Sequence, residues 1–486
     1  MKELYELSIK QAADMLEKKE ISAQELTQAC IARAKQSEQK INALVTLCEE
    51  EALVMAKAVD EKRARGEKTG RLAGVPGIIK DGICTKDVRS TASSKMLYNY
   101  KPVYDACVIE KLKAEDFVLL GKANMDEIAM GSSTETSYFG VTRNPWDTQC
   151  VPGGSSGGSA ASVAADEAMF ALGSDTGGSV RQPAGFCGVV GVKPTYGTVS
   201  RYGLMAFASS LDQIGPVTKT VEDAALLMNI ISGRDERDST SAIMEYPDYE
   251  KDIQHEIRGM RVGVPKEYLA QEMSDEVRAV FEDTMRTFEQ MGAVVEETSL
   301  PTFDYALSAY YIISSAEVSS NLARYDGIRY GFRTENYSDL KEMYKRTRSE
   351  GFGDEVKRRI MLGNYVLSSG YYDAYYLKAL KVRTLIKEDF EKQFRKFDIL
   401  LSPVTPTPAF KMGEKSTPIE MYVSDLFTVP VNIAGMTALS LPVALSSDGL
   451  PIGVQIIADA FCENTMFKAA YNLEQAVQFA HKPAFK

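Results

Sequence analysis

Histidine is nearly absent from this sequence of 486 residues, which contains only His255 and His481. A Ser–His–Asp triad needs a histidine as its general base. Because His255 lies in a polar stretch and His481 close to the end, the sequence argues against such a triad. No group of His, Cys and Asp residues has the spacing of metal ligands, so we expect no metal centre.

Dense basic runs are also absent. The nearest is Lys357-Arg358-Arg359, which is short and is typical of a helix face. The chain has 56 Lys and Arg against 67 Asp and Glu, a formal net charge of −11. Nucleic acid affinity rests mainly on clustered Lys and Arg, so any nucleic acid partner is expected to be held by another chain.

The seven cysteines are odd in number, scattered, and without a C-x-x-C pair. This pattern predicts buried free thiols in a reducing compartment, and hence a cytoplasmic protein. The first twenty residues are amphipathic and carry both charges, unlike a signal peptide.

Membrane spans are equally unexpected. The one long uncharged stretch lies between Asp425 and Asp448, and Pro430, Gly435 and Pro442 interrupt it. Such breaks do not suit a spanning helix, so we predict two buried strands or cavity-lining segments there and no membrane contact.

Alternation of short β-like runs with helical segments predicts an α/β fold; the runs include GVPGIIKD, FVLLGKAN, AMFALGSDT and GVVGVKP. Ser22 with Glu25 predicts a capped helix start, a second helix is expected from Ser274 to Met291, and 234–259 is expected to be a long surface connection. Composition, 44% hydrophobic and 25% charged, is ordinary for a soluble enzyme. One large domain, residues 1–486, with a helical insertion is the simplest organisation. Its expected parts are N-terminal helices over 1–68, a catalytic core over 74–233, a tyrosine-rich helical insertion over 303–397, and a return to the sheet with a last helix over 398–486.

Three segments have the composition of a catalytic site. They are GIIKD, in which Lys80 closes an apolar run; PGGSSGGS, which contains Ser155, Ser156 and Ser159; and GSDTGGS, which ends at Ser179. A flexible linker would not sit between buried-looking runs such as AASVAA and MFALG. A phosphate loop would show Gly-Lys-Ser/Thr or G-x-G-x-x-G after a strand, and neither is present.

Glycine-rich backbone can direct successive N–H groups toward a developing oxyanion. Thr176, Gly177, Gly178 and Ser179 suit that task, and Ser179 at the end of the run would be the nucleophile. A serine needs a base, and with histidine disfavoured the candidate is Lys80. Burial at the end of VPGII would lower its pKa from ~10.4 toward 7–8.

The combination of a strand-end lysine, a GGSSGGS loop and a D-T-G-G-S run resembles the amidase-signature enzymes. The separations also agree, with Ser155 75 positions after Lys80 and Ser179 24 positions after Ser155. The resemblance covers essentially the whole chain. It implies one α/β domain with a mixed central sheet covered by helices on both faces. It also implies that Ser179 is the nucleophile, Lys80 the base, and Ser155, beside a cis peptide, the bridge between them; the residues alone do not choose among Ser155, Ser156 and Ser159.

Within that family the chain is similar to the A subunits of glutamyl-tRNA(Gln) amidotransferases. The likeness is carried by stretches such as NMDEIAMGSSTETSYFG, RQPAGFCGVVGVKPTYGTVSRYGL and LSSGYYDAYY. It implies hydrolysis of glutamine to glutamate and ammonia through a glutamyl ester. Partner subunits of the B and C types would complete a heterotrimer. One partner would use the ammonia, with ATP and Mg²⁺, to amidate Glu-tRNA(Gln) or Asp-tRNA(Asn), so this chain itself would need no cofactor and would meet tRNA only indirectly.

The same resemblance assigns the glutamine site to Arg359 and Asp425, with Tyr310 near them. A guanidinium and a carboxylate suit the two charged groups of an α-amino acid. Where the family often reads M-G-G-S, this chain has a serine at Ser132, in the floor of the expected pocket.

Two other interpretations remain open from the sequence. A stand-alone amidase acting on another amide would use the same three residues, and only its pocket and partner surface would differ. A non-catalytic subunit of a larger assembly would have no need of Lys80, Ser155 and Ser179 together.

Overall fold

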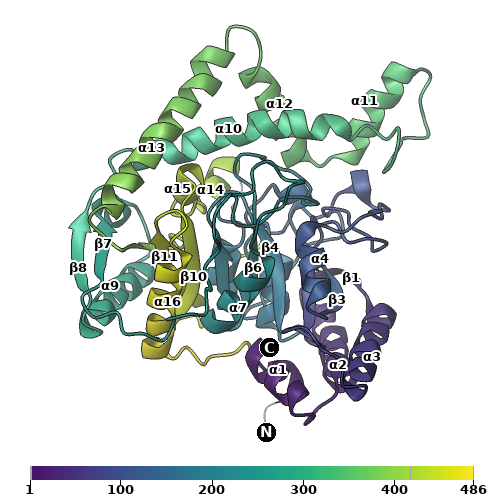
Figure 1. Ribbon diagram of the computed structural model, residues 1–486. Helices are drawn as coiled ribbons and strands as arrows, with labels where there is room; N and C mark the ends of the chain where they lie inside the picture. Colours follow the sequence, from purple (N-terminus) through teal and green to yellow (C-terminus); the bar gives the residue numbers. More distant parts are fainter. Residues whose placement is uncertain (1–2, 416, 485–486) are drawn as a thin grey trace.

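A mixed sheet of eleven strands runs through the molecule (Figure 1). The computed structural model describes residues 3–415 and 417–484. The strands are β1 (Leu44–Leu47), β2 (Pro76–Lys80), β3 (Val118–Ala123), β4 (Phe170–Asp175), β5 (Val190–Lys193), β6 (Gln213–Thr218), β7 (Arg261–Pro265), β8 (Val294–Thr298), β9 (Ile399–Pro403), β10 (Thr437–Leu445) and β11 (Pro451–Ala458).

Their order across the sheet is β1-β3-β2-β4-β6-β5-β10-β11-β9-β7-β8. The pairs β2–β3, β2–β4, β7–β8 and β7–β9 are parallel, and the other pairs are antiparallel. Parallel β2 and β4 place their carboxyl ends side by side at the same edge of the sheet. Lys80 closes the first of these strands and Asp175 the second.

Helices account for most of the remaining regular structure. The α-helices are α1 (Ile9–Glu17), α2 (Ala23–Ile41), α3 (Glu49–Ala64), α4 (Cys107–Ala114), α5 (Gly157–Ala164), α6 (Arg181–Cys187), α7 (Val221–Ile231), α8 (Lys266–Ala270), α9 (Asp275–Gln290), α10 (Ala306–Asn321), α11 (Leu340–Gly351), α12 (Asp354–Val366), α13 (Lys378–Phe394), α14 (Pro418–Val423), α15 (Val429–Ala434) and α16 (Glu463–Val477). Short 3-10 turns are η1 (Leu4–Glu6), η2 (Lys95–Leu97), η3 (Glu127–Ala129), η4 (Phe303–Tyr305) and η5 (Leu322–Arg324), and η6 (Tyr372–Leu377) is a π-helical turn.

Capping residues set the starts of several helices. Ser22 accepts the N–H of Glu25, and the Glu25 side chain accepts the N–H of Ser22, a reciprocal capping box. Ser274 caps α9, and its side chain accepts the Val277 N–H. At the other end of α2, Asn42 adopts the left-handed conformation at φ 50°. Both starts agree with the sequence prediction.

Helices pack on both faces of the sheet, which confirms the predicted fold class. Along β10, Leu439 and Leu441 belong to the larger hydrophobic core together with Met466 of α16. Ala438, on the alternate side, belongs to a second core with residues of α10, α13 and α15. This period of two is the expected signature of a strand buried on both faces. Helices α10–α13 form a separate layer across the top of the molecule, while both termini lie at the bottom (Figure 1).

The strand-like runs GVPGIIKD, FVLLGKAN, AMFALGSDT and GVVGVKP contain β2, β3, β4 and β5 respectively. Two strands were not predicted. One, β6, contains Gly215 and Pro216, residues that sequence rules place in turns; here a Cβ at position 215 would lie 1.8 Å from the Val192 carbonyl oxygen, so the neighbouring strand requires glycine. The other, β8, lies at the sheet edge and is mostly exposed.

The uncharged stretch after Asp425 corrects one prediction. Its second half forms β10, but its first half is a helix, α15, rather than a strand. Pro430 lies in the first turn, where its missing N–H costs nothing, and Gly435 ends the helix at φ 81°. No helix in residues 3–415 and 417–484 is long and apolar enough to cross a membrane.

Cysteine burial follows the prediction with one exception. Six of the seven cysteines are buried free thiols, whereas Cys462, at the start of α16, is exposed. The connection over 234–259 has neither helix nor strand, as predicted, and Tyr249 and Ile253 anchor it to the core.

Candidate active site

Lys80 is completely buried at the end of β2. Its Nζ hydrogen bonds to Ser155 Oγ at 2.8 Å and to Ser156 Oγ at 2.7 Å, and it donates to the Ser174 carbonyl at 3.2 Å. Burial lowers the pKa of Lys80 to about 7, against the opposing pull of the more distant Asp126 and other carboxylates. A lysine surrounded by neutral hydrogen-bonding groups is therefore suited to lose its proton near neutral pH.

Ser155 and Ser156 lie between β4 and the first turn of α5. The Gly154–Ser155 peptide bond is cis, as the resemblance implied. Ser156 Oγ also donates to the Ser174 carbonyl at 3.1 Å and accepts the Ser174 N–H at 3.2 Å. Both hydrogen bonds hold this hydroxyl against the backbone of β4. Ser159, the third serine of this loop, instead donates to the Leu172 carbonyl at 3.1 Å and does not contact Lys80.

Ser179 lies beside this pair. Its carbonyl accepts the Ser156 N–H at 3.0 Å, and its side chain belongs to a residue only 9% exposed. Within the described residues, the Ser155 and Ser179 hydroxyls are not hydrogen bonded to each other. Catalytic hydrogen bonds often close only when substrate is bound. The structure thus brings together Lys80, Ser155 and Ser179, the residues of the predicted proton relay. The hydrogen bond between Lys80 and Ser155 is formed, and in the part of the chain described the one between Ser155 and Ser179 is not.

The loop 176–180 has three amide groups available for an oxyanion. In the part of the chain that the structure describes, the N–H groups of Thr176, Gly177 and Ser179 have no hydrogen-bond acceptor. Gly178 differs from the prediction, because its N–H donates to Asp175 Oδ1 at 2.9 Å. Its φ of 133° and the 2.1 Å that would separate a Cβ from Thr428 Oγ1 require glycine there. The Thr176 hydroxyl is likewise occupied, donating to Asp212 at 2.7 Å.

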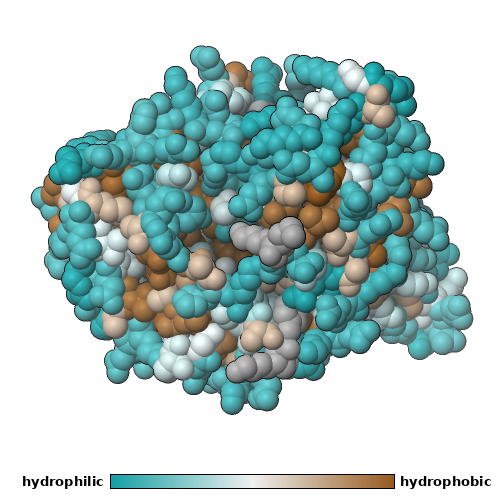
Figure 2. All heavy atoms as spheres, turned by 90° about the horizontal axis from the view of Figure 1, so that it is seen from below, coloured by the Kyte–Doolittle hydropathy of each residue, from teal (hydrophilic) through white to brown (hydrophobic). Residues whose placement is uncertain are grey.

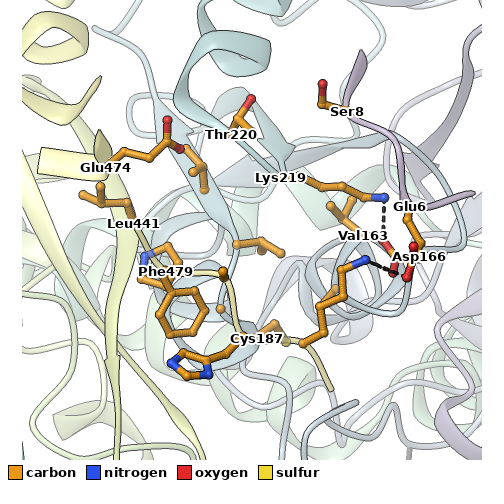
Figure 3. A pocket seen from close by; sticks show the side chains of 18 of the residues that line it. Glu6, Ser8, Val163, Asp166, Cys187, Lys219, Thr220, Leu441, Glu474 and Phe479 are labelled. Carbon is orange, nitrogen blue, oxygen red and sulfur yellow. Dashed lines mark hydrogen bonds and ion pairs between the residues drawn. The ribbon is translucent and has the colours of Figure 1, made fainter. Parts of the chain in front are cut away.

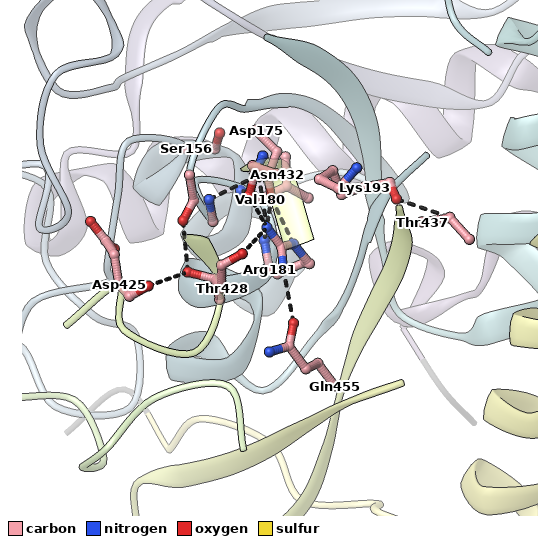
Figure 4. Close-up of polar contacts among 12 residues, drawn as sticks. Ser156, Asp175, Val180, Arg181, Lys193, Asp425, Thr428, Asn432, Thr437 and Gln455 are labelled. Atoms are coloured by element: carbon pink, nitrogen blue, oxygen red, sulfur yellow. Dashed lines mark hydrogen bonds and ion pairs between the residues drawn. The ribbon is translucent and has the colours of Figure 1, made fainter. Parts of the chain in front are cut away.

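Asp175 organises this loop together with Arg181, and both side chains are fully buried (Figure 4). Arg181 Nε and Nη2 donate to the two Asp175 carboxylate oxygens at 3.0 and 3.1 Å. The guanidinium also donates to the Thr428 carbonyl, Asn432 and Gln455. Burial would raise the pKa of Asp175, but Arg181 outweighs it and the pKa lies at about 2. The pair stays charged and holds the 176–180 loop against α15 and β11.

Arg359 of α12 is a second buried cation, only 4% exposed. Its Nε donates to Glu355 Oε1 at 2.7 Å, and its guanidinium carbon lies 4.7 Å from the Tyr311 ring centroid and 5.1 Å from that of Tyr422. One nitrogen, Nη1, is buried without a partner among the described residues. A buried donor without an acceptor is costly, and an anionic ligand group would supply that acceptor.

Asp425 lies between Ser132 and Tyr311. Ser132 Oγ donates to Asp425 Oδ2 at 2.6 Å, and Tyr311 Oη donates to the same oxygen at 3.5 Å. Burial raises the pKa of Asp425 to about 7, opposed by the Ser132 hydrogen bond and by Arg359. The serine at which this sequence departs from the family pattern therefore contacts the predicted ammonium ligand.

Tyr310 joins the two parts of the site. A Cβ at Gly177 would lie 2.7 Å from Tyr310 Oη, so the phenol is packed directly on the nucleophile loop. Its ring is 5.0 Å from that of Tyr311, its neighbour on α10. A cavity of about 260 Å³ opens beside Arg359, lined also by Gly131, Ser132 and Tyr422; Ser179 is not part of its wall.

A larger cavity than this one, about 590 Å³, lies elsewhere (Figure 3). It is at the bottom of the molecule, between α1, α16 and the tail that carries Phe479 and His481. Lys219 and Lys482 both contact Asp166 there, at 2.5 and 3.5 Å. On the face seen from below, hydrophilic side chains predominate and hydrophobic ones gather toward the middle (Figure 2).

Neither histidine lies at the relay. His481 lines this lower cavity, and His255, 68% exposed, pairs with Asp252. Sequence reasoning missed the residues that only support the site, and a partial signal existed for two of them, because Asp175 lies inside GSDTGGS and Arg181 follows Ser179 by two positions. The missed residues are Asp175, Arg181, Tyr311, Glu355, Tyr422, Thr428, Asn432 and Gln455.

Comparison with known proteins gives a consistent result. The amidase family model matches residues 25–467. The chain is 59% identical to the A subunit of the glutamyl-tRNA(Gln) amidotransferase of Carboxydothermus hydrogenoformans, over 99% of both chains, and 57% identical to that of Halothermothrix orenii, also over 99% of both. The crystal structure of the corresponding subunit from Thermotoga maritima superposes with a TM-score of 0.84 at 42% identity, covering 99% of this chain and 98% of that one.

Proposed function

Because this chain belongs to the amidase family, we propose that it is the glutamine-hydrolysing A subunit of a tRNA-dependent amidotransferase. The observation that carries the proposal is the 2.8 Å contact between Ser155 and a buried Lys80, beside Ser179 and with neither histidine of the chain nearby. The naming of its relatives supports a multi-subunit enzyme.

Lys80 is the general base of the proposed mechanism. The neutral amine accepts the proton of Ser155, which in turn takes the proton of Ser179. Ser179 Oγ attacks the side-chain amide carbon of glutamine, and the amide oxygen becomes an oxyanion facing the Gly177 and Ser179 N–H groups. Collapse breaks the C–N bond, and the proton returns through Ser155 to the departing ammonia.

The second half-reaction releases glutamate. Water loses a proton through the same relay, attacks the glutamyl–Ser179 ester, and frees the Ser179 oxygen, which regains its proton. Each cycle consumes one glutamine and one water and leaves the three side chains unchanged. A partner subunit uses the ammonia, with ATP and Mg²⁺, to amidate Glu-tRNA(Gln) or Asp-tRNA(Asn), and B- and C-type subunits complete the heterotrimer.

Arg359 and Asp425 hold the two charged ends of glutamine. The free Nη1 of Arg359 binds the α-carboxylate, and Asp425 binds the α-ammonium. Arg359 and Asp425 together form the proposed glutamine cradle, and Tyr310, packed on Gly177, joins it to the oxyanion loop. A glutamine held in the cradle would extend its side-chain amide toward Ser179.

The test measures glutamate release by the full chain, alone and co-expressed with the B- and C-type subunits of its own source, with and without ATP, Mg²⁺ and misacylated tRNA. Strong stimulation by the complete set is expected. High activity on simple amides with indifference to partners would instead support a stand-alone amidase, and no hydrolysis under any condition would support a non-catalytic subunit.

A matched pair of variants tests the relay itself. Ser155→Ala should abolish trapping of the glutamyl ester by hydroxylamine. Ser159→Ala removes a buried hydroxyl from the adjoining helix α5, where it is bonded to the Leu172 carbonyl, and it should leave trapping intact. Equal losses in both variants would contradict the assignment of Ser155.

A further inference from the structure

The helix that carries Arg359 begins without a cap of its own. Gly353, its N-cap residue, has no side chain to accept a helical N–H. The carboxylate of Glu127 lies there instead, and its Oε2 accepts the Gly353 N–H at 2.8 Å across 226 positions of sequence. A Cβ at Gly353 would lie 2.4 Å from that oxygen, so this close approach requires glycine.

Glu127 is itself fixed by its surroundings. Its side chain is 4% exposed, and its other oxygen accepts the Ser94 hydroxyl at 2.5 Å. Its backbone N–H donates to Thr136 Oγ1 at 3.1 Å. The carboxylate is therefore a rigid connection between the 94–97 turn, its own loop and the start of α12.

The two ends of this connection carry opposite halves of the glutamine cradle. Five positions along its loop lies Ser132, which donates to Asp425, the proposed ammonium ligand. On α12 lies Arg359, which is proposed to bind the α-carboxylate of the substrate, together with its ion-pair partner Glu355. The distance between the two halves depends on how α12 is held against the loop.

We propose that Glu127 is a positioning residue for substrate recognition, which sets α12 so that Arg359 and Asp425 together match the two charges of an α-amino acid. This inference rests on the proposed function. Glu127 touches neither substrate nor the relay, so its effect is on substrate affinity and not on the chemical step.

The charge of Glu127 strengthens the connection. An anion at a helix N-terminus is stabilised by the helix dipole, and a charged acceptor makes a stronger hydrogen bond. Burial raises the pKa of Glu127 to about 7, opposed by the Ser94 and Gly353 hydrogen bonds and by Lys357, while Asp354 raises it further. The connection is thus strongest above pH 7, where Glu127 is ionised.

The experiment uses Glu127→Gln in the full chain, assembled as for the glutaminase assay. We expect the KM for glutamine to rise about tenfold at pH 8, with kcat within about twofold, from loss of one charge-assisted hydrogen bond. The ratio of variant to wild-type KM should approach one at pH 6, where wild-type Glu127 is protonated. Because the ratio cancels the titration of Lys80 and Asp425, it isolates Glu127.

Gly353→Ala disrupts the same contact by placing a Cβ against the Glu127 carboxylate, so it should raise KM by a similar factor. The KM of the double variant should be no higher than that of either single variant. The control is Asp223→Asn. Asp223 is also a buried carboxylate that caps a distant helix, accepting the N–H groups of Ile9 and Lys10, but it lies at the bottom of the molecule. Its KM should be unchanged even where its thermal stability falls.

An unchanged KM in Glu127→Gln, an equal rise in Asp223→Asn, or a fall confined to kcat would each overturn the inference. Hydrogen exchange of the first turn of α12 gives a readout that needs no substrate, and it should quicken in Glu127→Gln and Gly353→Ala. Unchanged exchange there would also overturn it. If wild type hydrolyses no glutamine, the proposed function fails, while the exchange result still reports on the contact.

Discussion

Two buried basic residues of this protein, Lys80 in the proposed relay and Arg359 in the proposed glutamine cradle, have opposite surroundings. Lys80 contacts two hydroxyls and a carbonyl and forms no ion pair within the described residues. Arg359 is bonded to Glu355 and stacked against aromatic rings. Burial lowers the pKa of Lys80 to about 7, whereas carboxylate and phenol groups around Arg359 overcome the effect of burial and raise its pKa.

The difference shows that burial, which disfavours a charged side chain, can serve two roles. Burial without a counter-ion makes an amine release its proton near neutral pH, as a base must. Burial with a counter-ion keeps a guanidinium charged and leaves one donor for a carboxylate ligand. The comparison predicts that changes in the relay affect turnover, and changes in the cradle affect substrate affinity.

The largest effect is expected from Ser179→Ala. Removing the nucleophile should lower kcat for glutamine by ~10⁴-fold or more, because members of a relay act as a unit. Calorimetry should still detect glutamine binding, since the cradle is intact. Turnover comparable with wild type would exclude Ser179 as the nucleophile. Lys80→Ala should lower kcat nearly as much, because it removes the base of the same relay.

Arg359→Lys should raise the KM for glutamine by roughly 100-fold with a much smaller change in kcat. A lysine keeps the charge but loses the planar pair of donors that bind Glu355 and a carboxylate together. Arg346→Lys is the control, because Arg346 forms similar helical ion pairs on an exposed face of α11. A selective loss of kcat would break the proposed division between relay and cradle.

The pH dependence separates the two regions. Because the base must be neutral and the pKa of Lys80 is about 7, kcat should fall about tenfold per pH unit below 7 and level off above it. The pKa of Asp425 is also about 7, so KM should rise as pH falls and this carboxylate is protonated. Asp425→Asn should remove the contribution of Asp425 to the KM profile and leave the smaller contribution of Glu127, while the kcat profile persists. A simultaneous loss of the kcat profile would contradict this.

The smallest effect is on stability. Lys80 has a lower pKa folded than unfolded (~10.4), so the unfolded chain binds more protons between pH 7 and 10, and the folded state gains stability as pH rises through that range. Lys80→Met removes the buried charge but also three hydrogen bonds, so at pH 7 we expect a gain of about 1 kcal/mol. By pH 10 to 11 the variant should be the less stable protein in urea unfolding. A gain that is independent of pH would contradict the burial argument.

The sequence predicted the relay more completely than its supports. Lys80 and Ser179 were deduced from residue type and from the shortage of histidine, while Ser155 needed the family resemblance. Arg181 has only a partial local signal, its position two residues after Ser179, because three of its partners lie about 250 positions or more away: Thr428, Asn432 and Gln455. The first half of the uncharged segment was predicted as a strand or cavity lining, since apolar runs of that length do not by themselves distinguish strand from helix.

Short-range patterns by themselves determined the α/β class, the helix starts at Ser22 and Ser274, and the glycine-rich loop that ends at Ser179, because capping and backbone freedom act within a few residues. Tertiary structure alone decided the proton affinity of Lys80, the unpaired donor of Arg359 and the contact between Glu127 and Gly353. Those properties depend on burial and on groups far apart in the chain, and the free energy of a buried charge is set by everything packed around it.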